Sequence, residues 1–221
     1  MQTLKVGNEV IRFSGTWSCI FFGDLEAINK LVESVRREGI RIVEVGSWEG
    51  FTASFIGLMV SGVKGKVFTI DHWQGEAGHG SAELALRRDV FKKFRQNMIK
   101  AGLWQTVVYP LVMDSMTAVD LFREDYLDLV FIDADHSYTC VKKDILGWLP
   151  KIRKGGVICG HDCWGKYTNY NLKGRREIDL HKEDGKTPFE CHPGVIRALY
   201  DVFGDDYEIP NVKSTVWCKY V

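Results

Sequence analysis

The stretch Val130-Phe131-Ile132-Asp133-Ala134-Asp135-His136-Ser137-Tyr138 decides the fold of this chain. Its apolar start ends in two carboxylates and a histidine. Farther along, the apolar run Gly156-Val157-Ile158-Cys159-Gly160 ends in His161 and Asp162. Two such strands of a parallel sheet bring their ends to one edge, where α/β folds bind ligands. Carboxylates and imidazoles there can hold a divalent metal ion, and a histidine can move a proton.

Outward from this stretch, apolar runs alternate with amphipathic segments. We expect strands at residues 40–45, 66–70, 106–112, 127–132 and 156–159, and helices at 24–37, 51–60, 81–101, 115–122, 138–149 and 194–203. The alternation predicts an α/β fold, a Rossmann-like, doubly wound, mostly parallel sheet with helices on both faces. Two closing strands, at 207–209 and 215–221, bring the expected sheet to seven strands. Asp24 is expected to cap the first helix.

The chain reads as a single domain over residues 1–221, because no linker or internal repeat interrupts it. Residues 1–23 form an N-terminal segment whose Trp17, Ile20, Phe21 and Phe22 would contact a second copy in a homo-oligomer. Residues 163–192 are polar, aromatic and charged, and they precede the last helix. A long insertion of this kind in a compact domain is often functional, so we expect a substrate lid.

The composition of the chain limits the classes of molecule that it is expected to bind. Twenty-nine Lys and Arg balance twenty-nine Asp and Glu, so no basic surplus favours nucleic acid. No apolar run is long enough to span a bilayer, and the N-terminus lacks a signal-peptide pattern. The six cysteines lie mostly in or beside apolar runs and read as reduced thiols. We therefore expect a cytoplasmic protein that acts on a small molecule.

Residues 44–50, Glu-Val-Gly-Ser-Trp-Glu-Gly, join an expected strand to its helix. Glycines at 46 and 50 allow a tight turn and close approach to a ligand. Trp48 replaces the middle glycine of the dinucleotide fingerprint, so the turn suits the amino-acid or sulfonium end of a ligand. Asp71 ends the next strand, where a carboxylate can bind ribose hydroxyls. Each feature alone is also an ordinary turn or surface aspartate, but together they favour a nucleotide-type cofactor.

Three segments now combine: 44–50, Ile-Asp-His-Trp-Gln-Gly at 70–75, and the block from Val130 through Asp162. Together they resemble the class I S-adenosylmethionine-dependent methyltransferases. The resemblance is to the metal-dependent O-methyltransferases of the macrocin and mycinamicin sugar type, with catechol O-methyltransferases as distant relatives. It covers about residues 24–162. It implies methyl transfer from S-adenosylmethionine, assisted by Mg²⁺ or Mn²⁺, to a hydroxyl of a small polar acceptor, a sugar or glycosylated metabolite.

The resemblance also implies roles for particular residues. Those of the cofactor site are Glu44, Gly46, Ser47 and Gly50 at the methionine end, Asp71 and His72 at the ribose, Asp114 and Ser115 near the adenine, and Asp133. The metal ligands would be Asp133, His161 and Asp162. Relatives usually carry two oxygen ligands at the last pair of positions, so His161 departs from the pattern. A histidine there shifts the metal preference from magnesium towards manganese or a later transition metal.

His136 stands where the resembling families place a general base. A histidine titrates near neutrality, which suits removal of a proton from an acceptor hydroxyl. The alternative is a helix-capping or supporting histidine that orients Asp133. A zinc site of Cys159, His161 and Cys163 with Cys191 and His192 is disfavoured by its spacing. A non-catalytic cofactor-binding domain and an NAD-dependent enzyme are the rival functions, and comparing adenosylmethionine with NAD binding separates them.

Overall fold

The computed structural model describes residues 2–6, 9–13, 20–76, 80–183 and 192–221, and only the backbone for the first two segments. Within these ranges no helix is long and apolar enough to cross a membrane. Of the expected contacts with a second copy, Trp17 lies outside the described residues. Ile20 is buried, whereas Phe21 and Phe22 are 70% and 76% exposed. The homo-oligomer stays a prediction.

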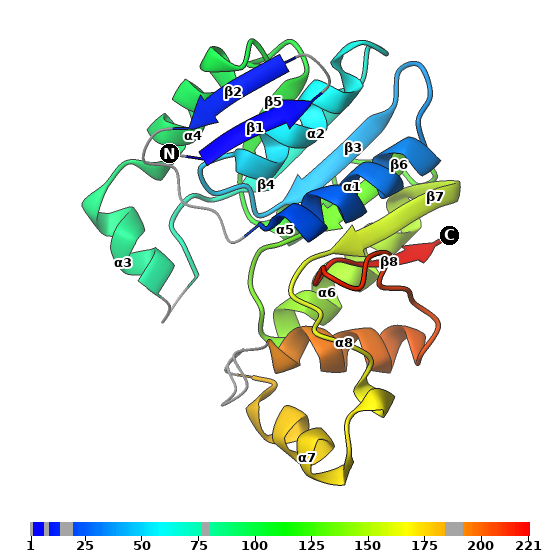
Figure 1. Ribbon diagram of the computed structural model, residues 1–221. Helices are drawn as coiled ribbons and strands as arrows, with labels where there is room; N and C mark the ends of the chain where they lie inside the picture. The colour runs from blue at the N-terminus through cyan, green and yellow to red at the C-terminus, as the bar shows by residue number, and fades with distance from the viewer. Residues whose placement is uncertain (1, 7–8, 14–19, 77–79, 184–191) are drawn as a thin grey trace.

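The main sheet has six strands among the described residues, in the order β5-β4-β3-β6-β7-β8 (Figure 1). They are β3 (Arg41–Val45), β4 (Lys66–Asp71), β5 (Val108–Val112), β6 (Leu127–Ile132), β7 (Ile152–Gly160) and β8 (Trp217–Tyr220). Neighbours run parallel except β8, which is antiparallel to β7. A separate hairpin pairs β1 (Gln2–Val6) with β2 (Glu9–Phe13).

Helices cover both faces of this sheet. One face carries α1 (Phe22–Ser34), α2 (Phe51–Ser61) and α4 (Val90–Lys100), and the other carries α5 (Ser115–Val119), α6 (Tyr138–Trp148) and α8 (Pro193–Phe203). Successive strand residues point to opposite faces, so Leu129 and Phe131 join the first cluster and Val130 and Ile132 the second. All of β6 is buried, which explains its unbroken apolar run. The doubly wound α/β fold is thus confirmed.

The expected seventh strand is wrong. Tyr207–Ile209 forms no strand, and only Glu208 bridges to Cys218 of β8. The two residues exchange both backbone hydrogen bonds at 2.8 Å. Pro210 follows and has no N–H to donate, so the ladder cannot continue there.

Helix boundaries also differ from expectation, and local hydrogen bonds account for two of these differences. The helix expected at 81–101 is divided into α3 (Gly80–Arg87) and α4, because the Asp89 side chain accepts a hydrogen bond from the Lys92 N–H at 2.8 Å and caps a new helix. The first helix begins at Phe22, so Asp24 is not its N-cap residue. Its carboxylate instead accepts from the Phe21 N–H at 2.8 Å, reaching back across the first turn.

The insertion before α8 contains the short 3₁₀ helix η2 (Tyr167–Asn169) and α7 (Leu172–His181). In Figure 1, α7 lies beyond α8, away from the main sheet. The ring of Tyr167 lies 4.6 Å from that of Tyr200 on α8, and Arg197 pairs with Asp179 at 2.7 Å. Residues 163–183 are therefore anchored on α8. Residues 184–191 lie outside the described residues, and a lid over the site stays a prediction.

Candidate active site

The site lies at the carboxyl ends of β3 and β6, where the strand order reverses. The Gly46 N–H donates to the Ile70 carbonyl at 2.9 Å, and the Asp133 N–H donates to the Val45 carbonyl at 2.8 Å. Gly46 has a φ of 85°, and a Cβ there would lie 2.0 Å from the Asp133 carbonyl oxygen. Only glycine allows the turn after β3 to approach the turn after β6 this closely.

Asp71 shapes the glycine turn from the neighbouring strand. Its Oδ2 accepts from the N–H groups of Ser47 and Trp48, each at 2.9 Å, and its Oδ1 accepts from Trp73 N–H at 2.6 Å. The turn and the carboxylate therefore come together, as the sequence predicted. The ribose contact itself stays a prediction.

Glu44 is fully buried beneath this turn. Its Oε2 accepts from the Ser47 hydroxyl at 2.5 Å, while its Oε1 has no hydrogen-bond partner among the described residues. Burial raises the pKa of Glu44 to about 8, against the opposing Ser47 hydrogen bond. A buried carboxylate oxygen left without a donor is costly, so this atom favours a ligand that brings one.

The three predicted metal ligands meet at the ends of β6 and β7. Single ligand atoms of Asp133, His161 and Asp162 lie within 4.8 Å of one another. His161 Nδ1 is 3.2 Å from Asp162 Oδ2 and 3.8 Å from Asp133 Oδ1. Asp162 has a φ of 62°, a conformation that aspartate tolerates better than most residues. Burial raises the pKa of Asp133 to about 6, whereas hydrogen bonds from His136 and His161 outweigh burial and hold the pKa of Asp162 well below its usual value.

The other nitrogen of His161 faces away from this group. Nε2 lies 3.2 Å from Asp24 Oδ2 and 2.9 Å from the Thr215 hydroxyl oxygen. Burial would lower the pKa of His161, but its hydrogen bonds with Asp162 and Asp24 raise it well above the ordinary value. Asp24 therefore fixes the ring so that Nδ1 points to the two aspartates. This contact could not be predicted from sequence patterns, because Asp24 lies in the first helix, far along the chain from His161.

His136 joins the same edge from the loop after β6. Nε2 lies 2.8 Å from Asp162 Oδ2, and Nδ1 lies 3.3 Å from Glu76 Oε2. Burial would lower the pKa of His136, but the hydrogen bonds to Asp162 and Glu76 raise it to about 10. Its titration thus differs from the near-neutral value expected of a free histidine, because two carboxylates stabilise the imidazolium. A base role requires that Asp162 first release this ring.

The sequence grouped His192 with His161 only in the disfavoured cysteine-containing zinc site, not with His136 and Asp162. His192 immediately precedes α8, and its ring stacks on that of His136 with centroids 4.0 Å apart. His192, His136 and Asp162 form a second group whose ligand atoms lie within 4.8 Å of one another. A pocket beside both groups is lined by Asp133, His136 and His161 with apolar residues of β6, α6, α8 and β8.

The remaining predicted residues lie at the expected strand ends but have local partners. Asp114 caps α5 by accepting from the Thr117 N–H at 2.9 Å, and the Ser115 hydroxyl accepts from the Trp148 indole at 2.9 Å. His72 is exposed, and its Nδ1 accepts from the Gln74 N–H at 3.0 Å. Their contacts with the cofactor stay predictions.

The zinc alternative gains no support. Neither of the two metal-type groups among the described residues contains a cysteine. The Cys159 thiol instead donates to the Val130 carbonyl at 3.3 Å. Cys191 lies outside the described residues.

Residues 43–163 match the family described as a methyltransferase domain. This span is just over half of the chain and contains both strand ends of the site. The chain belongs to the methyltransferase family. A curated relative is the uncharacterized protein y4gI of Sinorhizobium fredii (strain NBRC 101917 / NGR234). It is 30% identical to this chain over 128 residues, which cover 55% of this chain. They cover only 13% of that longer protein.

Solved structures show the same fold. The apo structure of CalS11, a TDP-rhamnose 3′-O-methyltransferase of calicheamicin biosynthesis, matches with a TM-score of 0.54 at 13% identity, covering 89% of this chain and 78% of CalS11. TomG of Streptomyces achromogenes, an O-methyltransferase solved with S-adenosylmethionine, matches with a TM-score of 0.57 at 16% identity, covering 92% and 82%. An O-methyltransferase of Bacillus cereus matches at 0.53 and 20% identity, covering 91% and 82%. By family and fold, the chain is a class I methyltransferase.

Proposed function

We propose that the methyltransferase transfers a methyl group from S-adenosylmethionine to a hydroxyl of a small sugar-like acceptor, with a divalent ion held by Asp133, His161 and Asp162. One observation carries the proposal: these ligand atoms lie within 4.8 Å of one another at the carboxyl ends of β6 and β7, next to the switch point of the sheet and beside His136. O-methylation of a sugar is what the neighbour CalS11 performs, by its name.

The cofactor would rest on the turn between β3 and α2. The unpartnered Oε1 of Glu44 suits an ammonium group, which S-adenosylmethionine carries at its methionine end. The φ values near 85° at Gly46 and Gly50 open the backbone for close approach. When bound, S-adenosylmethionine supplies a methyl group on a positively charged sulfur. Asp71 would keep the hydrogen bonds that it accepts from the turn and would accept further hydrogen bonds from ribose hydroxyls.

The donor set also fits a metal ion. Two carboxylates and an imidazole nitrogen converge, and Asp24 holds the opposite nitrogen of His161 at 3.2 Å. A carboxylate behind a histidine ligand fixes the ring and raises its basicity. A divalent ion supplies charge that lowers the pKa of an acceptor hydroxyl. The mixed set suits Mn²⁺ at least as well as Mg²⁺.

His136 would remove the acceptor's proton through Nε2. Glu76 lies at Nδ1 and holds the ring with Nε2 towards Asp162. With Asp162 engaged by a cation, His136 would keep only Glu76 of the two carboxylates that hold its proton. The neighbouring apolar side chains Val141, Val195 and Trp217 line the pocket and would exclude water from the reacting atoms.

The proposal is tested in two stages. Calorimetry with S-adenosylmethionine and with NAD comes first, and binding of NAD alone would contradict the cofactor assignment. Transfer of a labelled methyl group is then screened over sugars, nucleotide sugars and catechols, with chelator, Mg²⁺ or Mn²⁺. Asp133→Asn should bind cofactor but lose at least a hundredfold in rate. Full turnover after removal of all metal would leave a reaction driven by His136 without an ion.

A further inference from the structure

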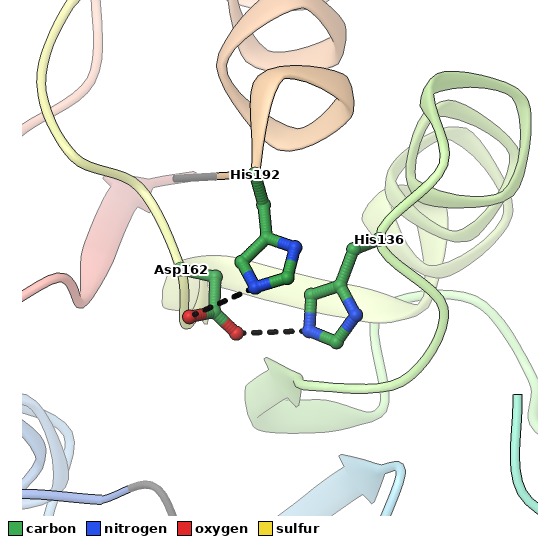
Figure 2. Close-up of side chains that lie close together, drawn as sticks. All are labelled: His136, Asp162 and His192. Carbon is green, nitrogen blue, oxygen red and sulfur yellow. Dashed lines mark hydrogen bonds and ion pairs between the residues drawn. The ribbon is translucent and has the colours of Figure 1, made fainter. Parts of the chain in front are cut away.

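A second cluster beside the proposed magnesium or manganese site has a different chemistry. His136, Asp162 and His192 come from three elements: the loop before α6, the end of β7 and the residue before α8. Figure 2 shows both imidazole rings facing the same carboxylate, one towards each oxygen. Two neutral-nitrogen donors and one carboxylate are a set that later transition metals prefer over magnesium.

The backbone is built to bring these rings together. Gly194 lies against the loop that carries His136, and a Cβ on Gly194 would be 2.2 Å from the His136 carbonyl oxygen. Pro193 occupies the first turn of α8, where its missing N–H costs nothing. Any larger residue at 194 would push His192 away from His136. The His192-Pro193-Gly194 sequence therefore sets the distance between the two rings.

The distances suit a small ion with short bonds. Nε2 of His136 lies 2.8 Å from Asp162 Oδ2, and Nε2 of His192 lies 3.8 Å from Asp162 Oδ1. Bonds of about 2.0–2.1 Å at tetrahedral angles separate ligand atoms by roughly 3.3 Å, and one ligand atom from each of the three residues lies within 4.8 Å of the others. The two rings are stacked, with an angle of 28° between their planes, so they must rotate apart for both nitrogens to bind one ion.

The ligands are also supported and accessible. Glu76 lies 3.3 Å from Nδ1 of His136 and fixes which nitrogen faces the cluster. The side chains of His136, Asp162 and His192 are 20%, 16% and 30% exposed. An ion can therefore enter from solvent and keep a fourth position for water.

We propose that His136, Asp162 and His192 form a binding site for zinc or a similar divalent transition ion, distinct from the set of Asp133, His161 and Asp162. The zinc site goes beyond the proposed methyl transfer and does not depend on it, whereas its inhibitory effect rests on the proposed base role of His136. Both sites use Asp162, so the two ions compete for its carboxylate. Zinc at this site also occupies the nitrogen with which His136 would take a proton, so it holds the enzyme in an inactive form.

The test is a titration of the chelator-treated full chain with Zn²⁺ by calorimetry and with Co²⁺ by visible absorption, without cofactor or acceptor. His192→Asn keeps a good helix-capping residue before α8, and it should weaken zinc binding at least tenfold and remove the intense cobalt bands of a low-coordinate site. Mn²⁺ binding, followed by electron paramagnetic resonance, should stay within twofold of wild type. His181→Asn, a histidine outside the cluster on α7, is the matched control and should change neither.

Three results would overturn the inference. Equal zinc affinity and equal cobalt spectra in wild type and His192→Asn would assign the ion to Asp133, His161 and Asp162. No zinc binding by wild type would leave the two rings as a hydrogen-bonded pair only. In an active preparation, zinc should inhibit wild type at least tenfold more strongly than His192→Asn. Equal inhibition would likewise exclude His192 as a ligand.

Discussion

Replacing Glu44 by glutamine should stabilise the protein, and increasingly so as the pH rises. Glutamine keeps an oxygen that can accept from the Ser47 hydroxyl, 2.5 Å from the carboxylate in the wild type, but it cannot ionise. Burial raises the pKa of Glu44 to about 8 from an ordinary 4.5. Between these values the folded chain holds a proton that the unfolded chain has released. The free energy of unfolding therefore falls as the pH rises through this window.

The magnitude follows from the two pKa values. Ionisation of Glu44 in the unfolded chain lowers the free energy of unfolding of the wild type relative to Glu44→Gln. The difference is less than about 1 kcal/mol at pH 5, about 3 kcal/mol at pH 7 and about 4–5 kcal/mol above pH 8. Urea unfolding of wild type and Glu44→Gln at pH 5, 7 and 9, with chelator present, measures these differences. A difference that stays constant over this range, or a variant less stable than wild type at pH 9, would refute the assignment of a buried, protonated Glu44.

The same group couples cofactor binding to pH. If the ammonium of S-adenosylmethionine pairs with Oε1, as proposed, it lowers the pKa of Glu44 and binding releases a proton. Wild-type affinity should then rise up to tenfold from pH 6 to 7, a range in which the cofactor's amino group stays charged. Glu44→Gln should show a flat profile. Parallel profiles would place the ammonium elsewhere without affecting the stability prediction.

Three further predictions concern a buried ion pair, a close backbone contact and the proposed base. Asp128 is fully buried and accepts from two arginine side chains, so Asp128→Asn should cost about 2–4 kcal/mol in urea at pH 7. The pKa of Asp128 is lowered by these partners despite burial, and the loss should shrink as the pH falls below about 4. Gly46→Ala should reduce cofactor affinity by calorimetry and cost more stability than Gly39→Ala, whose φ of 68° is similar but whose Cβ meets nothing within 4 Å. His136→Ala should lower the methyl-transfer rate about a hundredfold with cofactor affinity unchanged, and His136→Lys should retain part of the rate. An alanine variant that regains full rate at saturating metal would make His136 a support for Asp133.

The sequence predicted the elements where one local rule decided the outcome. The apolar run of β6 ends at Asp133 because a strand covered on both faces tolerates no charge until it leaves the sheet. The glycine turn after β3 was predicted because only glycine fits the positive φ of Gly46. Failures came where two local signals competed. Asp89 caps a new helix inside a long amphipathic stretch, and Pro210 ends a strand-like segment before it can pair.

The parts of the site that sequence could not supply are contacts between distant segments. The sequence motifs predict that His136 and His161 belong to the site, but they do not predict which ring nitrogen faces it. That choice is made by Glu76 behind one ring and Asp24 behind the other. Neither carboxylate lies in the block from Val130 through Asp162, and Asp24 is far from His161 in sequence. A histidine becomes a ligand or a base through the partner of its second nitrogen. Its chemistry is therefore set by the tertiary fold, which also brings His192 to the shared Asp162.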